Sequence, residues 1–217
     1  MGLWTGILDL FFPPRCAFCR KLLRRGESGM CAACEKSLPY TTDGGRQKGD
    51  FVELCVSPLY YEGNVRDALL RYKFKGTTAY AGVFARLLAD CVKENLAGRY
   101  DLISWVPLSS RRLRERGYDQ AMILAMAMAL ELDDVAAETL KKTAEVAPQS
   151  ETGSAEKRRA NISGAYEVPD PELVAGKRIL LVDDIVTTGA TFSECARTLG
   201  LAGAESVVCA AVARSRD

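Results

Sequence analysis

The sequence predicts an α/β fold, with a mostly parallel β-sheet flanked by helices and a small cysteine-rich module before it. Residues 178–184, RILLVDD, form an apolar run that ends in two carboxylates, and a helical pattern opens at Ala190. Apolar runs at 101–107 and 205–213 alternate with helical segments, as in βαβ units. Four of the eight cysteines form two Cys-x-x-Cys pairs near the N-terminus.

The N-terminal residues predict an amphipathic helix, which either docks on the body of the protein or anchors it at a membrane surface. Its apolar face contains Leu3, Trp4, Ile7, Leu8 and Phe11. Asp9 and the lack of a basic start argue against a secretory signal peptide, and no apolar run is long enough to span a bilayer. We therefore expect a cytoplasmic protein without integral membrane contact.

The paired cysteines predict a structural zinc site. The expected ligands are Cys16, Cys19, Cys31 and Cys34. Each pair offers two thiolates from one tight turn, and four thiolates leave no open position for water. Gly26 and Gly29 suit a hairpin turn between the pairs. Two disulfides are the alternative, which a reducing cytoplasm disfavours. We expect residues 1–50 to form this helix and zinc module.

Composition narrows the chemistry of the remaining residues. The chain has no histidine, which excludes Cys-His and Ser-His catalytic arrangements. Catalysis must then rely on carboxylates, Lys and Arg, hydroxyls, backbone amides or a metal. A net charge of +1 argues against global attraction to nucleic acid.

The main domain is expected at residues 51–217, after a polar, glycine-rich linker at 41–50. Residues 51–63 predict strand structure at the edge of this domain, and 64–76 and 77–96 predict helices. The first helical segment ends in Lys73, Lys75 and Gly76. Lysines beside a glycine turn can neutralise pyrophosphate. Alternatively they simply end a solvated helix, where their positive charge interacts favourably with the negative end of the helix dipole.

An arginine-rich exit loop is expected at 108–120, after the strand at 101–107. Such loops line the ligand crevice of parallel sheets, where arginine binds phosphate bidentately. The loop contains Arg111, Arg112, Arg114 and Arg116. A nucleic-acid patch and a solvated helix face are the alternatives. Residues 121–132 predict a core helix, and the polar segment 143–161 is either disordered or a mobile lid that excludes water.

The acidic pair and the turn after it predict a sugar-phosphate ligand. Asp183 and Asp184 follow a strand, and ligands bind beyond the carboxyl ends of such strands. A short turn at 185–189 then offers hydroxyls, backbone N–H groups and a helix N-terminus to an anion. The segment is neither a Walker A loop nor a GxGxxG fingerprint.

This stretch resembles the phosphoribosyl pyrophosphate (PRPP) signature of type I phosphoribosyltransferases. The resemblance implies that Asp183 and Asp184 bind the ribose 2- and 3-hydroxyls. It also implies a 5-phosphate loop made of Thr187, Thr188, Gly189, Ala190 and Thr191.

Over essentially its whole length the chain resembles the ComF family, a type I phosphoribosyltransferase-like fold with an N-terminal zinc module. The blocks that carry this resemblance are FFPPRC, both Cys-x-x-Cys pairs, YKFKG, VPLSSRRLRERGYDQ, a KKT…Q…R..N loop and LLVDDIVTTGAT. The positions assigned to the loop and second substrate are Gln120, Thr143, Gln149, Arg158 and Asn161. Asp119 stands where the family commonly has asparagine, and the interval from Gln149 to Asn161 is about one residue longer than expected. Both departures concern the second substrate.

The resemblance implies transfer of the ribosyl 5-phosphate group from PRPP to an unidentified acceptor, with release of pyrophosphate. Magnesium bridges pyrophosphate and ribose oxygens in this scheme. The residues expected to bind PRPP or take part in catalysis are Lys73, Lys75, Gly76, Arg116, Asp183, Asp184 and the 5-phosphate loop. The alternative is a non-catalytic PRPP sensor or scaffold in DNA uptake, docking a helicase-type partner or single-stranded DNA. Direct DNA binding through the zinc module and the arginines is the third possibility.

Overall fold

The computed structural model describes residues 13–143 and 164–216. Its main sheet follows the order β1-β2-β8-β7-β4, with β3 paired to β8. The strands are β1 (Gln47–Gly49), β2 (Val52–Val56), β3 (Leu59–Tyr60), β4 (Leu102–Trp105), β7 (Arg178–Val186) and β8 (Ser206–Arg214). β1 is antiparallel to β2, whereas the other pairs are parallel, which confirms the predicted mostly parallel sheet.

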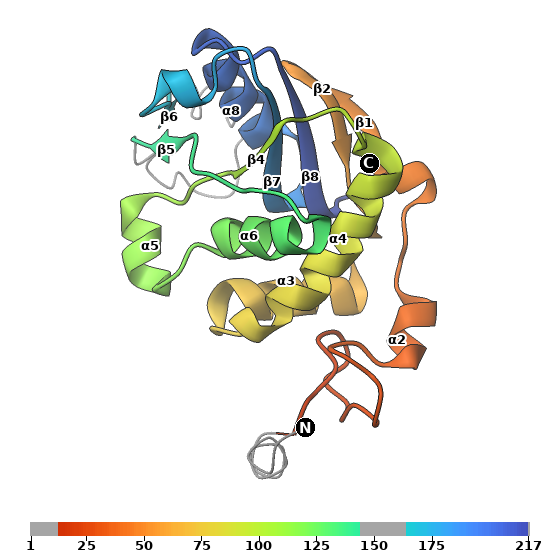
Figure 1. Ribbon diagram of the computed structural model, residues 1–217. Coiled ribbons are helices and arrows are strands. Elements are labelled where there is room, and N and C mark those ends of the chain that lie inside the picture. Colours follow the sequence, from red (N-terminus) through yellow and green to blue (C-terminus); the bar gives the residue numbers. More distant parts are fainter. Residues whose placement is uncertain (1–12, 144–163, 217) are drawn as a thin grey trace.

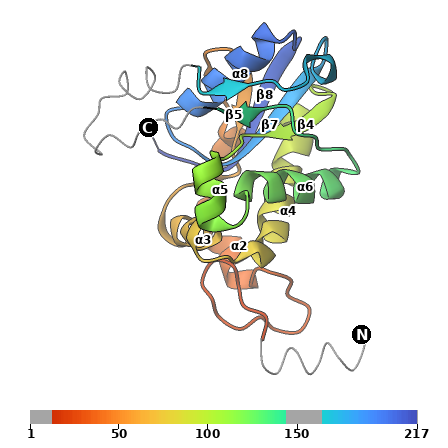
Figure 2. The same cartoon turned by 90° about the vertical axis from the view of Figure 1, so that its left-hand side faces the viewer.

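Helices cover both faces of this sheet, as Figures 1 and 2 show. On one side lie α3 (Gly63–Phe74), α4 (Ala81–Leu96) and α6 (Gln120–Leu132), and on the other lies α8 (Ala190–Leu201). Shorter elements are α2 (Ala32–Ser37), η1 (Thr42–Gly45), η2 (Thr78–Tyr80), α5 (Ser110–Arg116), η3 (Pro171–Leu173) and the antiparallel pair β5 (Lys141–Lys142) and β6 (Tyr166–Glu167). The predicted helices at 64–76, 77–96 and 121–132 correspond to α3, α4 and α6.

The apolar run in β7 is continuous because the strand is buried on both faces. Leu180 and Val182 join the core beneath α3, α4 and α6, whereas Ile179 and Leu181 join the core beneath α8. All four side chains are fully buried. Successive side chains of a strand point to opposite faces.

The end of β7 differs from the prediction. The strand continues through both carboxylates to Val186, so the turn is shorter than the expected 185–189. The cause is pairing: β8 is equally long and matches Asp183 with Ala211 and Val186 with Arg214. Since the pleat continues, Asp183 and Asp184 leave the strand toward opposite faces of the sheet.

Two predicted irregular segments also contain regular structure. Residues 110–116 of the expected arginine loop form α5, whose N-cap Ser109 accepts a hydrogen bond from the Arg112 N–H and whose C-cap Gly117 is left-handed. In the expected linker, Gln47–Gly49 forms β1. The division of the chain into domains at residue 50 stays a prediction.

The cysteine module packs against α3 and α4. Arg86 Nη2 on α4 donates to the Ser28 carbonyl at 2.7 Å, and the Phe18 ring meets the edge of Phe84 at a centroid distance of 5.9 Å. Gly29 has a positive φ of 72° and lies so close to α4 that a Cβ atom would overlap Val83 Cγ2. The glycine is therefore needed both for its backbone conformation and for close packing.

Replacing Gly29 with alanine is expected to lower the free energy of unfolding by about 1–3 kcal/mol, because backbone strain adds to the overlap with Val83. Urea titration followed by circular dichroism measures this change in unfolding free energy. Gly26→Ala is the matched control, since Gly26 also has a positive φ but faces open space. Equal losses in the two variants would contradict the packing argument.

Within residues 13–143 and 164–216, no helix is long and apolar enough to cross a membrane. The predicted N-terminal helix and three predicted loop residues, Gln149, Arg158 and Asn161, lie outside the described residues.

Candidate functional site

A cavity of about 360 Å³ opens at the carboxyl ends of β4 and β7, beside the start of α8. Both carboxylates of the acidic pair line it, together with Gln120, Thr187 and Thr191. Among the described residues, the cationic side chains that line it are Lys73, Arg112, Arg116 and Lys142. A volume of this size is typical of small-molecule sites.

Asp184 is the buried member of the acidic pair, with 1% of its surface exposed. Its Oδ2 atom lies 3.0 Å from Lys73 Nζ at the end of α3, forming an ion pair. Oδ2 accepts no hydrogen bond of good geometry from the described residues. Lys73, the predicted pyrophosphate lysine, therefore neutralises Asp184, a predicted ribose carboxylate.

Asp183 lies on the α8 side of β7 and is partly exposed to the cavity. Its Oδ1 atom accepts a hydrogen bond of 2.8 Å from the backbone N–H of Asp184. Desolvation and the neighbouring Asp184 carboxylate raise the pKa of Asp183 well above its usual range. Proton uptake at this position is thus easier than at an ordinary aspartate.

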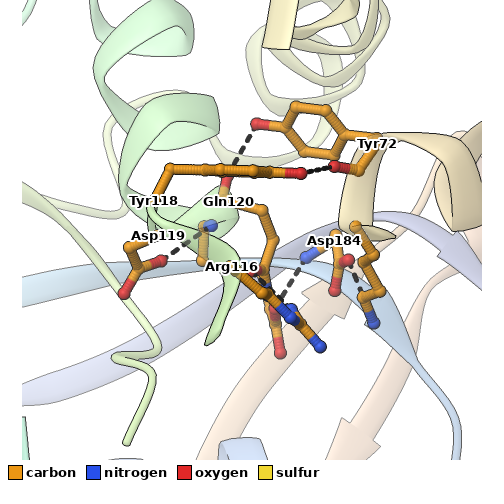
Figure 3. Close-up of polar contacts among 9 residues, drawn as sticks. Tyr72, Arg116, Tyr118, Asp119, Gln120 and Asp184 are labelled. Atoms are coloured by element: carbon orange, nitrogen blue, oxygen red, sulfur yellow. Dashed lines mark hydrogen bonds and ion pairs between the residues drawn. The ribbon is translucent and has the colours of Figure 1, made fainter. Parts of the chain in front are cut away.

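Arg116 and Gln120 also line the cavity, and Figure 3 shows both side chains together with Asp184. Arg116 Nη1 donates to Gln120 Oε1 at 2.7 Å, and its guanidinium lies 4.7 Å from the centroid of the Phe74 ring. The carbonyl of Gln120 accepts a hydrogen bond of 2.7 Å from the Tyr72 hydroxyl, and the Tyr118 hydroxyl donates to the Tyr72 carbonyl. These bonds fix α5 and α6 against α3.

Asp119 is 8% exposed and caps α6. Its Oδ1 accepts from the N–H groups of Ala121 (2.9 Å) and Met122 (3.1 Å), and its Oδ2 accepts from Leu108 N–H (3.0 Å). Burial nevertheless raises its pKa. A carboxylate suits this position because both of its oxygens accept from backbone donors, whereas asparagine has one acceptor oxygen.

Replacing Asp119 with asparagine is expected to cost about 1–2 kcal/mol of stability, because one backbone N–H loses its acceptor and faces an amide donor. Thermal and urea unfolding measure this loss of stability. Asp170→Asn is the matched control, since Asp170 caps η3 through a single exposed bond to Glu172 N–H. An Asp119→Asn protein as stable as Asp170→Asn would contradict this role.

The predicted 5-phosphate loop divides between two cavities. Thr187 and Thr191 line the main cavity, whereas Thr188 and Gly189 line a smaller one of about 180 Å³ that borders β1. Gly189 is the N-cap of α8 with a φ of 73° and has no side chain that could cap the helix. Thr188 Oγ1 accepts a long hydrogen bond of 3.4 Å from the N–H of Ala190, the first helical residue. The N-terminus of a helix suits an anion. Ala190 opens α8 and lines neither cavity.

The remaining predicted residues near α3 lie at the rim. Lys75 is the exposed C-cap of α3 and does not line the main cavity. Gly76 lines a neighbouring cavity of about 520 Å³, which shares Lys73, Arg112 and Arg116 with the main one. Thr143 is exposed after β5 and does not line the main cavity.

Sequence reasoning missed the β5–β6 pair as part of the site. Lys142 Nζ lies 3.2 Å from the Tyr166 hydroxyl and 5.0 Å from the centroid of its ring, and both side chains line the cavity. Burial and nearby Arg112 lower the pKa of Lys142. The basic KKT block of the sequence could have indicated Lys142 as a site residue. No local sequence pattern indicates Tyr166.

The four predicted zinc ligands come together in the N-terminal module. The Sγ atoms of Cys16, Cys19, Cys31 and Cys34 all lie within 4.8 Å of one another, and none forms a disulfide. Cys19 Sγ and Cys31 Sγ are 3.7 Å apart, and tetrahedral Zn–S bonds place sulfurs about 3.8 Å apart. Burial opposes ionisation of Cys16, but backbone N–H groups, first that of Cys31, outweigh it and lower its pKa to about 7. The cluster fits a structural zinc ion.

Family models match both parts of the chain. Residues 7–45 match the double zinc ribbon domain, and residues 114–217 match the phosphoribosyl transferase domain. Together with the mostly parallel sheet and its flanking helices, the second match identifies the fold as that of a type I phosphoribosyltransferase.

Two similar proteins cover nearly the full length. Competence protein F of Haemophilus influenzae is 27% identical over 94% of this chain and 99% of its own. DNA utilization protein YhgH of Escherichia coli K12 is 30% identical over 91% of this chain and 96% of its own. Among solved structures, glutamine PRPP amidotransferase from B. subtilis aligns over 64% of this chain and 30% of that chain, with 19% identity and a TM-score of 0.44. On the full-length matches, this chain belongs to the ComF family.

Proposed function

We propose that the protein binds PRPP with magnesium and transfers its ribosyl 5-phosphate group to an acceptor, releasing pyrophosphate. The observation that carries this proposal is a single cavity that holds the acidic pair of β7, the cations and the start of α8. Carboxylates suit ribose hydroxyls, whereas cations and a helix N-terminus suit phosphate groups. PRPP carries all of these groups in one molecule.

In this proposal each wall of the cavity binds one part of the ligand. Asp183 and Asp184 accept hydrogen bonds from the ribose hydroxyls. The 5-phosphate binds at Thr187, Thr191 and the N-terminus of α8, where backbone N–H groups are available. Pyrophosphate binds the cationic groups of Lys73 and Arg116 on the α3 and α5 side.

The donor set is also suited to magnesium, which prefers carboxylate oxygens and substrate phosphates. Asp184 Oδ2 has Lys73 as its charged partner and no well-aligned hydrogen-bond donor among the described residues. Bound magnesium would neutralise charge on the pyrophosphate.

The protein's own groups then favour breakage of the bond between the sugar carbon and the pyrophosphate oxygen. Lys73 and Arg116 stabilise the negative charge that develops on the leaving group. The carboxylates of Asp183 and Asp184 balance the positive charge of an oxocarbenium-like sugar and keep its orientation fixed. The acceptor displaces pyrophosphate at the same carbon.

A scaffold role in DNA uptake is the second candidate, and the relatives' names favour it. One is called a competence protein and another a DNA utilization protein. In this version a cytoplasmic protein binds PRPP without turnover, and its zinc module docks a helicase-type partner or single-stranded DNA.

Pyrophosphate release separates the two candidates. Incubation of the native protein with PRPP, magnesium and a panel of bases and cell-extract metabolites is expected to release pyrophosphate with at least one acceptor, which mass spectrometry then identifies as a ribosylated product. The Asp183→Asn, Asp184→Asn double variant is expected to release none. If the native protein releases no pyrophosphate with any acceptor, the catalytic proposal fails, and unchanged DNA uptake in cells that carry the double variant then favours the scaffold role.

A further inference from the structure

Helix α3 contacts both the zinc module and the cavity near its C-terminal end. Arg71 and Lys73 lie two residues apart, which places their side chains on different sides of a helix. Arg71 reaches the first Cys-x-x-Cys turn, and Lys73 reaches Asp184. The two sites are thus joined by one turn of helix.

Arg71 binds the backbone of the zinc turn itself. Its Nη2 atom donates to the carbonyls of Ala17 at 2.8 Å and Phe18 at 2.9 Å, the residues between Cys16 and Cys19. Ala17 and Phe18 are 0% and 2% exposed, so these bonds are shielded from water. Bonds from a charged donor are stronger than neutral ones.

The same helical turn is also held by contacts within α3 and with α4. The Arg71 carbonyl accepts the C-cap N–H of Lys75 at 2.8 Å. Tyr72 packs its ring on Phe84, at a centroid distance of 5.4 Å, and Phe84 contacts Phe18 of the zinc turn. A displacement of the zinc turn would therefore reach Tyr72 and Lys73 through both a hydrogen bond and ring packing.

We propose that Arg71 is a positioning residue through which the zinc module sets the place of Lys73 and hence the affinity for PRPP. The proposal rests on the proposed function. When zinc is bound to Cys16 and Cys19, the carbonyls of Ala17 and Phe18 are held in place as acceptors for Arg71. Arg71 in turn fixes the last turn of α3, which contains Lys73. Coupling of this kind is reciprocal, so bound PRPP also raises the affinity of the module for zinc, measured by competition with a chelator at equilibrium.

The matched pair for the test is Arg71→Ala and Arg86→Ala. Both arginines donate to backbone carbonyls of the zinc module, but Arg86 lies on α4 and lines neither cavity beside Lys73. In zinc-loaded protein, calorimetry is expected to show about tenfold weaker PRPP binding for Arg71→Ala and native affinity for Arg86→Ala. Arg71→Lys keeps the positive charge but loses the planar guanidinium with its fixed set of N–H donors. We expect this variant to bind PRPP with an affinity between those of Arg71→Ala and the native protein.

Amide hydrogen exchange at residues 72–75 provides a readout that needs no PRPP. We expect faster exchange in Arg71→Ala and in zinc-depleted native protein than in zinc-loaded Arg86→Ala. If the native protein does not bind PRPP, the proposed function fails while the exchange data still test the coupling. Equal PRPP affinity in the two alanine variants, or equal exchange at these amides, would overturn the role of Arg71.

Discussion

Replacing Asp184 with asparagine is expected to weaken PRPP binding by about 100-fold. Asparagine is nearly the same size, so the cavity keeps its shape while the negative charge disappears. The ribose hydroxyls then lose a charged acceptor, a bond worth about 1.5–3 kcal/mol. Lys73 also loses its ion-pair partner at 3.0 Å, which changes the charge balance around the sugar. Titration calorimetry measures the affinity.

A control must separate this local effect from the general loss of an ion pair. Asp101→Asn is a suitable control. Asp101 Oδ1 forms an ion pair of 2.6 Å with Arg178 Nη2, and Arg178 lies at the opposite end of β7, away from the cavity. We expect Asp101→Asn to bind PRPP like the native protein. Unchanged binding by Asp184→Asn would remove Asp184 from the ligand site.

Loss of the zinc cluster is expected to give the largest loss of stability. In Cys34→Ser the cluster keeps three thiolates, and a four-thiolate site binds zinc far more weakly without one of them. Because binding free energy at structural zinc sites is folding free energy, we expect a loss of at least ~4 kcal/mol, or roughly 10 °C in melting temperature. Metal analysis and thermal unfolding measure both changes.

Cys91→Ser is the matched control for this loss. Cys91 is a buried thiol of α4 outside the cluster, with its Sγ 3.8 Å from the Gly44 carbonyl. We expect this variant to keep its zinc and most of its stability. A Cys34→Ser protein with native zinc content and melting temperature would contradict a structural role for the cluster.

The sequence predicted the parts of the fold that depend on local pattern. Burial on both faces of β7 requires a continuous apolar run, and spacing alone paired the cysteines. The end of β7 was not predictable in this way, because pairing with β8 carries the strand through two charged residues. Helix α5 was predicted only as an alternative to a loop, since its middle is highly charged and its signals are the single caps Ser109 and Gly117.

For the candidate site, the sequence identified groups at the ends of strands and helices but not their partners. The ion pair between Lys73 and Asp184 joins residues more than 100 positions apart, and no local pattern encodes it. Tyr166 reaches the cavity through the pairing of β6 with β5 and the contact of β6 with α8. The role of Asp119 as an acceptor for three backbone N–H groups likewise depends on how the chain folds around it.

The central claim is that PRPP binds at the end of β7. Calorimetric titration with PRPP and magnesium tests it most directly, carried out in parallel on the native protein and on the Asp183→Asn, Asp184→Asn double variant. We predict saturable binding of one PRPP per chain to the native protein and none to the double variant. Absence of binding to the native protein, or equal binding to both, would contradict a PRPP site at the end of β7.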